Sequence, residues 1–371
     1  MGFDQYLGNQ RIVSAIRNML RNDRVPSAIL FTGPRGTGKF TLARMFAQAA
    51  NCERSHDDFC GECDTCQRIA TFADLDAMVS RGLAERGESA DAATVERTPL
   101  ILQAHQDVWA IVPDPVRLRT PVARPLIRAG QLRAIQRAGN FMPQARRRVF
   151  LIDGADTVRW AEADILLKAL EEAPPTTTMV LVATRPDAMP STIRSRCISF
   201  HFAPVPQADV ELLLKERADI TPKDAKIIAQ LSAGSPGIAL AIDLEQSRQL
   251  RANALAFLSK AIQGQKFAPV FSASAQMVKN EETSFENKLE VFYSLLTDLL
   301  AIVLSSKSGP LRNPDLRPGL EELGKRLNVG WIQRATAELD RLESGLRRNV
   351  GRQLGLDAWA VTLASTNVRE E

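Results

Sequence analysis

The stretch GPRGTGKF at positions 33–40 could form a phosphate-binding loop. Its three glycines are Gly33, Gly36 and Gly38. Glycines let backbone N–H groups surround an anion at the start of a helix, and Lys39 could then reach the outer phosphates of a nucleotide. The pattern G-x-x-x-x-G-K-[ST] requires a hydroxyl at its eighth position to hold a magnesium ion. That position is Phe40 here, which leaves open whether ATP or ADP still binds.

Two further positions bear on ATP hydrolysis. Thr41 follows Phe40, but on a helix it points about 100° away, so it could replace the missing hydroxyl only if the backbone shifts. The apolar run 149–152 ends at Asp153, an acid that could hold a metal ion. The next residue, where a glutamate could polarise the attacking water, is Gly154. Phosphoryl transfer depends on positioned charges, so the two losses together favour an abandoned catalytic site.

Four cysteines form a second group with the spacing of a metal site. They are Cys52, Cys60, Cys63 and Cys66, in the pattern C-x7-C-x2-C-x2-C. Four thiolates at this spacing can close a tetrahedral zinc site, and a reducing cytosol disfavours disulfides. Because four sulfurs leave no position for a catalytic water, the predicted zinc is structural. His56 is an alternative ligand, and Cys197 stands alone as a small buried side chain.

The elements that position these residues are visible in the apolar pattern. Three short apolar runs lie at 28–31, 149–152 and 179–183. Such runs fit strands that are buried on both faces of a parallel sheet. The first run leads into the phosphate loop, the stretch 41–46 predicts the helix after it, and a second helix is expected at 164–170. The chain up to about residue 203 therefore predicts an α/β domain.

The rest of the chain divides into three parts. Residues 72–129 are rich in Ala, Arg, Asp and Pro without clear periodicity, which favours a surface insertion. Residues 204–245 predict a short helical segment, and residues 246–371 a mostly helical region. Apolar residues three and four apart form a helical stripe at Phe285, Leu289, Phe292, Leu296, Leu299 and Val303. That stripe requires a partner surface, either within its own bundle or on another subunit.

The overall composition is that of a globular protein. The 371 residues are too many for one ordinary domain. The composition, 45% hydrophobic and 24% charged residues, is typical of a water-soluble globular protein. The apolar run near 291–304 contains Asp298 and is shorter than the ~20 residues of a membrane span. The first residues lack the basic and apolar segments of a signal peptide. We therefore expect a cytoplasmic protein without a membrane partner. The net charge of +4 is only weak evidence for a nucleic-acid partner.

Further stretches carry a resemblance to a known family. They are LLKALEEAP at 166–174, ATRP at 183–186 and SRC at 195–197. With the phosphate loop and the cysteine cluster, in this order, they resemble the bacterial DNA polymerase III clamp loader, which belongs to the AAA+ ATPases. The resemblance implies an α/β AAA+ P-loop domain at 1–203 with a parallel sheet and a zinc module at 52–66. It also implies a small helical lid at 204–245 and an all-α collar domain for oligomerisation at 246–371.

Departures from the motor subunits of this family indicate a subclass. Phe40 replaces the metal-binding hydroxyl and Gly154 the catalytic glutamate, while Gly237 stands where motor subunits have the arginine of "GSLR". The SRC arginine, Arg196, is retained. This combination is similar to the non-hydrolysing delta-prime subunits. The resemblance then implies that Arg196 acts in trans, on the γ-phosphate of ATP held by a neighbouring subunit.

The resemblance also implies partners: ATPase and delta subunits of the clamp loader, the sliding clamp indirectly, and primer–template DNA. Two other functions remain open, namely an ATP-hydrolysing motor subunit that uses Thr41 and Asp153, and a stand-alone zinc-containing nucleic-acid binder. The basic run 146–148, and Arg133 with Arg137 on an expected helix, could contact DNA phosphates. A solvated face is the simpler interpretation of each of these arginines, and an ordinary surface ion pair is the simpler one for Arg196.

Overall fold

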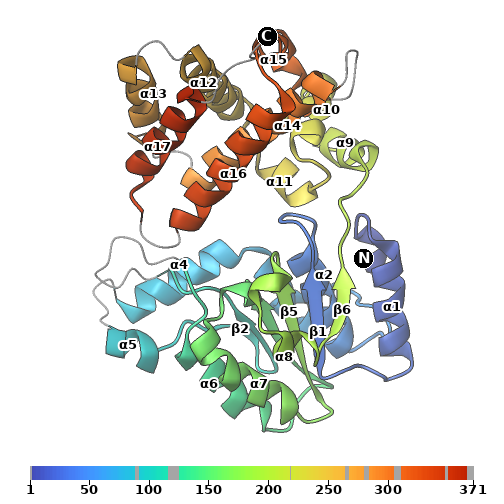
Figure 1. Ribbon diagram of the computed structural model, residues 1–371. Helices are drawn as coiled ribbons and strands as arrows, with labels where there is room; N and C mark the ends of the chain where they lie inside the picture. Colours follow the sequence, from blue (N-terminus) through green and yellow to red (C-terminus); the bar gives the residue numbers. More distant parts are fainter. Residues whose placement is uncertain are drawn as a thin grey trace. The chain divides into compact units, whose positions relative to one another are not determined.

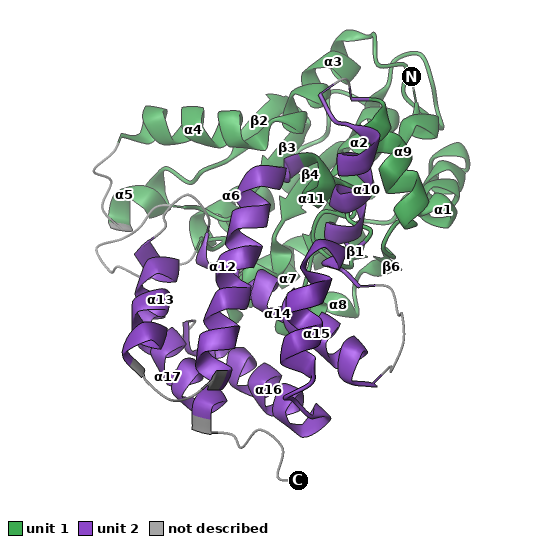
Figure 2. Ribbon diagram, turned by 90° about the horizontal axis from the view of Figure 1, so that it is seen from above, with its two compact units in different colours: residues 1–216, 234–240 green, residues 217–233, 241–371 purple. Residues whose placement is uncertain are grey.

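The chain is divided into two compact units, which Figure 2 shows in different colours. The computed structural model describes residues 2–87, 92–115, 125–217, 219–263, 267–279, 284–304, 311–346 and 350–365. Unit 1 comprises Met1–Glu216 and Gly234–Leu240, and unit 2 comprises Arg217–Ala233 and Ala241–Glu371. The segment 204–245, expected as a lid, thus contributes residues to both units.

Unit 1 is built on a six-stranded sheet with the order β2-β3-β4-β5-β1-β6 (Figure 1). The strands are β1 (Ala28–Thr32), β2 (Leu102–His105), β3 (Val108–Ile111), β4 (Arg148–Asp153), β5 (Thr177–Ala183) and β6 (Ile198–His201). All neighbours pair in parallel except β2, which runs antiparallel to β3 at one edge. The predicted strands β1, β4 and β5 are confirmed, and β5 lies between the other two.

Helices cover both faces of this sheet because successive strand side chains point to opposite sides. Ile29 and Phe31 pack into an apolar cluster with α1 (Gln10–Arg21), α2 (Lys39–Asn51) and α3 (Asp64–Ala70). Ala28 and Leu30 pack into a second cluster with α6 (Ala129–Gly139), α7 (Ala163–Glu171) and α8 (Ser191–Arg194). The result is a three-layer α/β/α domain, with α2 and α7 at the positions predicted for helices.

The predicted surface insertion at 72–129 is wrong for the residues that form two strands of the central sheet. It contains α4 (Leu75–Arg86), α5 (Ala92–Arg97) and the strands β2 and β3, which extend the central sheet. Both strands have only four residues, and α4 has no buried apolar residue. Such short strands and an unburied helix leave almost no periodic signal in a sequence. Residues 88–91 and 116–124 of this stretch lie outside the described residues.

The remaining helices complete the two units. Unit 1 contains α9 (Gln207–Lys215) and nearly all of α11 (Pro236–Ala241). Unit 2 contains α10 (Pro222–Leu231), α12 (Leu244–Gln263), α13 (Phe267–Lys279), α14 (Phe285–Leu304), α15 (Arg317–Gly324), α16 (Val329–Leu346) and α17 (Arg352–Ser365). Short 3-10 turns lie at Phe3–Gln5, Thr71–Ala73, Ala155–Thr157, Trp160–Glu162, Pro186–Ala188 and Pro314–Leu316. No helix among the described residues is long and apolar enough to cross a membrane.

The core of unit 2 is organised around three aromatic rings on α12, α14 and α17. The Trp359 ring lies with its centroid 4.8 Å from that of Phe292 and 5.7 Å from that of Phe257. Its indole N–H donates to the Ala335 carbonyl at 3.0 Å. The predicted stripe on α14 faces this core, since its members from Phe285 to Leu299 are buried. The stripe therefore finds its partner within its own bundle.

The aromatic contacts predict that unit 2 depends on Trp359. Trp359→Ala should lower the free energy of unfolding of unit 2 by about 3–5 kcal/mol, because a large buried ring leaves a cavity. Leu354→Ala is the matched control on the same helix; Leu354 is 68% exposed, so its effect should stay within about 0.5 kcal/mol. Urea unfolding followed by far-UV circular dichroism measures both, and equal effects would contradict this account of the core.

Candidate functional site

The phosphate loop connects β1 to α2, and its glycines are required by close contacts. Gly33 has φ 134°, and a Cβ atom there would lie 2.4 Å from the Phe202 carbonyl oxygen. Gly38 has φ 86°, and its Cβ would lie 2.7 Å from the Tyr6 hydroxyl. Residues with a side chain rarely adopt such φ angles, and neither position has room for a Cβ atom. The predicted strand–loop–helix arrangement is confirmed, and it places Lys39 at the first position of α2.

Lys39 is buried within the loop that precedes it. Its ammonium donates to the carbonyl oxygens of Gly33 at 2.8 Å and Pro34 at 2.6 Å. Burial lowers the pKa of Lys39, an effect that the nearby Asp153 carboxylate partly offsets. Within the described residues the lysine that would meet a nucleotide's outer phosphates is therefore bonded to the loop itself.

A second contact closes the loop from the side of α11. The Gly237 N–H donates to the Gly36 carbonyl oxygen at 2.8 Å, and both residues belong to unit 1. A Cβ atom at Gly237 would lie 3.2 Å from the Gly36 Cα and carbonyl oxygen, and one at Gly36 would lie 2.9 Å from the Ile238 nitrogen. The sequence identified Gly237 as the place of a missing arginine. The structure adds that the absent side chain permits this backbone contact.

The residues around the expected magnesium position are Phe40, Thr41, Asp153 and Gly154. Phe40 is half-buried and packs against the apolar cluster under the loop, while Thr41 is exposed on α2. Asp153 ends β4, where burial raises the pKa of its carboxyl group and the Gly154 N–H donates to it at 3.1 Å. Gly154 has φ 67°, and a Cβ there would lie 2.8 Å from Pro113 Cγ. A glutamate at position 154 would therefore require Pro113 to move.

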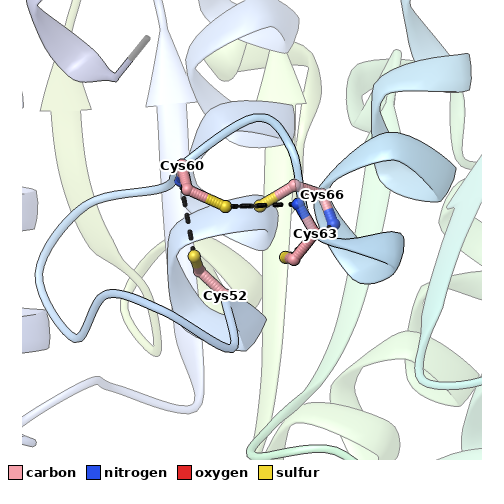
Figure 3. A group of neighbouring side chains, drawn as sticks. All are labelled: Cys52, Cys60, Cys63 and Cys66. Atoms are coloured by element: carbon pink, nitrogen blue, oxygen red, sulfur yellow. Dashed lines mark hydrogen bonds between the residues drawn. The ribbon is translucent and has the colours of Figure 1, made fainter.

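The four predicted cysteine ligands come together, as Figure 3 shows. Their sulfur atoms all lie within 4.8 Å of one another, and the Cys60 and Cys66 sulfurs are 4.0 Å apart. Tetrahedral zinc with Zn–S bonds of about 2.3 Å requires sulfurs about 3.8 Å apart. Cys52, Cys63 and Cys66 are buried, and all four cysteines are free of disulfides. The geometry fits a structural zinc ion, which would cross-link the end of α2 to the start of α3.

Backbone N–H groups around the cluster favour thiolates. The N–H groups of Glu62 and Cys63 donate to the Cys60 sulfur at 3.4 and 3.3 Å, and they lower the pKa of Cys60 to about 6. The Cys52 sulfur accepts from the Cys60 N–H and the Cys63 sulfur from the Cys66 N–H. Burial has the opposite effect on Cys66 and raises its pKa. A zinc ion at the centre of the cluster would offset this effect of burial on the Cys66 pKa, because zinc binds the thiolate form.

Charged side chains fix the cysteine module to the rest of unit 1. The Asp58 carboxylate pairs with Arg17 on α1 and accepts from the Phe3 N–H at 2.9 Å. The Arg146 guanidinium donates to the carbonyl oxygens of Cys52 and Ser55.

Two of the predicted alternatives are revised by these contacts. His56, the alternative zinc ligand, lies with its Nδ1 2.9 Å from Arg146 Nη1, away from the sulfur group. The interpretation of 146–148 as a solvated face is wrong for Arg147 and Arg148, which are buried. Arg148 pairs with the buried Asp107 at 2.7 Å, and Arg147 donates to the Pro175 carbonyl at 2.7 Å. Sequence reasoning missed these roles because a basic run carries no signal of its buried partners.

Arg196 lies at the opposite end of the sheet from the phosphate loop. It shortly precedes β6, which runs parallel to β1 with Ile198 opposite Ile29. The loop follows β1, so the five-residue strand, about 16 Å long, separates the two. The side chain of Arg196 is 41% exposed, and Nη2 lies 2.5 Å from the Glu171 carboxylate. Cys197, next to it, donates to the Ile193 carbonyl, and burial raises its pKa to about 12.

The fold and the loop together define a class of protein. A phosphate loop follows a buried strand, and one strand separates it from the strand that carries the buried acid. This is a P-loop domain of the AAA+ class. Residues 8–206, more than half of the chain, match the family described as DNA polymerase III, delta subunit. The chain belongs to this family.

Curated relatives carry names from the same polymerase. DNA polymerase III subunit gamma/tau of Mycoplasma genitalium is 29% identical over 244 residues, which cover 63% of this chain and 34% of the relative. Subunit tau of Escherichia coli is 27% identical over 248 residues, which cover 65% of this chain and 32% of the relative. The chain thus spans about a third of the length of these two relatives.

Solved structures give weaker likenesses. A DNA polymerase III gamma subunit-related protein of Thermotoga maritima has a TM-score of 0.38 at 15% identity, over 95% of this chain and 98% of that one. A variant of RuvB from the same organism has a TM-score of 0.39 at 17% identity, over 85% and 84%.

The sulfur geometry predicts the effect of removing one ligand. Cys63→Ser should lower the zinc content of the purified chain and the stability of the 52–66 module, because a serine hydroxyl is a poor zinc ligand. Cys197→Ser is the matched control, since Cys197 lies outside the group, and it should keep the metal. Elemental analysis and thermal unfolding measure both. A fully metallated Cys63→Ser variant with unchanged unfolding would refute the site.

Proposed function

We propose that this chain is a non-hydrolysing, delta-prime-type subunit of the DNA polymerase III clamp loader. It braces the complex and supplies Arg196 to the ATP of a neighbouring ATPase subunit while the sliding clamp is loaded on primed DNA. The observation that carries the proposal is the closed phosphate loop, in which Lys39 bonds to its own loop and Gly237 caps Gly36. The role implies the cytoplasm as its compartment.

Three motor residues are replaced by residues that fit the present packing. Phe40 contributes to the apolar cluster, Gly154 approaches Pro113, and Gly237 approaches the loop backbone. Restoring the motor side chains at 154 and 237 would displace neighbouring atoms. This packing supports a loop that is kept for structure.

The position of Arg196 supports a role in trans. It lies at the end of the sheet opposite its own phosphate loop, and this distance from its own loop is consistent with contact to an ATP held by another chain. A guanidinium is planar and charged at every physiological pH, which suits contact with a γ-phosphate. Arginine fingers that act in this way raise hydrolysis rates by ~10³ or more.

The other parts of the chain receive matching roles. We propose an AAA+ domain at 1–203, a lid at 204–245 and a collar at 246–371 through which the subunit joins its partners. Those partners are the ATPase and delta subunits, with the sliding clamp reached indirectly and primer–template DNA inside the complex. The zinc module at 52–66 supports the AAA+ domain and takes no part in chemistry.

An ATP-hydrolysing motor subunit of the same clamp loader is the alternative. It would use Thr41 and Asp153, but Thr41 is exposed on α2 and the carboxyl of Asp153 is buried with a raised pKa. A stand-alone nucleic-acid binder is a third possibility; it would bind DNA as a monomer with a steep salt dependence. The buried pairing of Arg147 and Arg148 argues against it.

The trans role of Arg196 is tested in the reconstituted clamp loader. Arg196→Ala should leave assembly intact and slow hydrolysis at the adjoining site by about 10³-fold or more, because the transition-state charge loses its partner. Arg194→Ala is the matched control: Arg194 lies two residues earlier and pairs with Asp187 at 3.1 Å. Rapid-quench measurement of phosphate release reports each rate. Unchanged turnover in the Arg196→Ala complex would refute the role.

A further inference from the structure

The guanidinium of Arg196 is held at two points by its own chain. Nη1 donates to the Thr192 carbonyl oxygen at 3.0 Å, and Nη2 forms the ion pair with Glu171 at 2.5 Å. A guanidinium carries five N–H donors. Within the described residues these two contacts leave most of them available, and the side chain is still 41% exposed. The arginine is therefore held in place without being covered.

The backbone that carries the two charges is fixed by the second apolar cluster. The Arg196 N–H donates to the Ile193 carbonyl at 3.1 Å, and the Ile193 side chain is 1% exposed in a cluster with Leu166 and Leu170 of α7. Glu171 is the last residue of the same helix. Because α7 and α8 pack together, the backbones of Glu171 and Arg196 are held close to each other.

The placement of Glu171 is unfavourable for the helix itself. Carboxylates near a helix C-terminus face the negative end of the helix dipole and lower helix stability. Glu172, one residue later, has a helix partner in Lys168 at 3.8 Å. Glu171 has its ion pair with Arg196 instead. The unfavourable position of this carboxylate at the helix C-terminus is explained if its function is to bind the Arg196 guanidinium.

We propose that Glu171 is a positioning residue, which holds Arg196 in the orientation in which it meets the phosphates of the neighbouring subunit's ATP. The inference rests on the function proposed above. A free arginine side chain samples many rotamers, and ordering it on binding lowers the gain from the contact. Glu171 and the Thr192 carbonyl reduce that loss before the neighbour arrives, and the remaining N–H groups stay open to an anion.

The first test compares Glu171→Gln with Glu172→Gln in the reconstituted clamp loader. Glu171→Gln should lower kcat at the adjoining site by about two- to fivefold, the worth of an exposed ion pair, and leave the KM for ATP unchanged. Glu172→Gln should behave as wild type. In an Arg196→Ala background, Glu171→Gln should have no further effect. A kcat that rises would mean that Glu171 sequesters Arg196, and it would overturn the proposal.

The second test uses the isolated chain and needs no neighbour. Nitrogen-15 relaxation of the Arg196 Nε–H group should report a lower order parameter in Glu171→Gln than in wild type or Glu172→Gln. Unchanged order in all three chains would overturn the positioning role. If Arg196→Ala itself leaves turnover unchanged, the trans function fails. If Arg196→Ala slows turnover and Glu171→Gln does not, the positioning role alone fails.

Discussion

The buried ammonium of Lys39 needs hydrogen-bond partners, and the arrangement around the phosphate loop follows from how it obtains them. A charged group on a buried residue is costly unless it is paired, and here the partners are two carbonyls of the preceding loop. The loop must curl tightly around the lysine to present those carbonyls, so it needs glycines with positive φ. The same curl exposes the Gly36 carbonyl to the Gly237 N–H. The loop between β1 and α2 is thus held by contacts with its own lysine and with α11.

The buried charges beside the phosphate loop and the exposed charge of Arg196 lie at opposite ends of the sheet. At the carboxyl end of the sheet, Lys39 and Asp153 are buried. Burial lowers the pKa of Lys39 and raises the pKa of Asp153, so it favours the neutral form of each. At the amino end, Arg196 keeps a partly exposed guanidinium, which is paired with Glu171. The domain therefore carries an exposed cation at the end of the sheet remote from its own loop. This polarity is what a subunit needs if it completes a neighbour's site and has none of its own.

Short-range signals in the sequence were sufficient to predict the loop, the clustering of the four cysteines and the buried strands. The GPRGTGKF stretch and the C-x7-C-x2-C-x2-C spacing each lie within fifteen residues, so their geometry is nearly local. Long-range contacts were not visible. The four-residue strands β2 and β3 join the sheet only through β4, and Arg148 is buried only because Asp107 lies beside it. The Glu171–Arg196 pair also joins two motifs that the sequence presents separately.

The account's central claim is that the phosphate loop no longer supports hydrolysis, and phosphate release by the isolated chain tests it most directly. The zinc-loaded protein is incubated with ATP and magnesium, without partner subunits, beside a Lys39→Ala variant. The account predicts that neither protein, each shown to be folded, releases phosphate above the blank. Turnover by the wild-type chain that Lys39→Ala abolishes would contradict it and identify a working motor that uses Thr41 and Asp153.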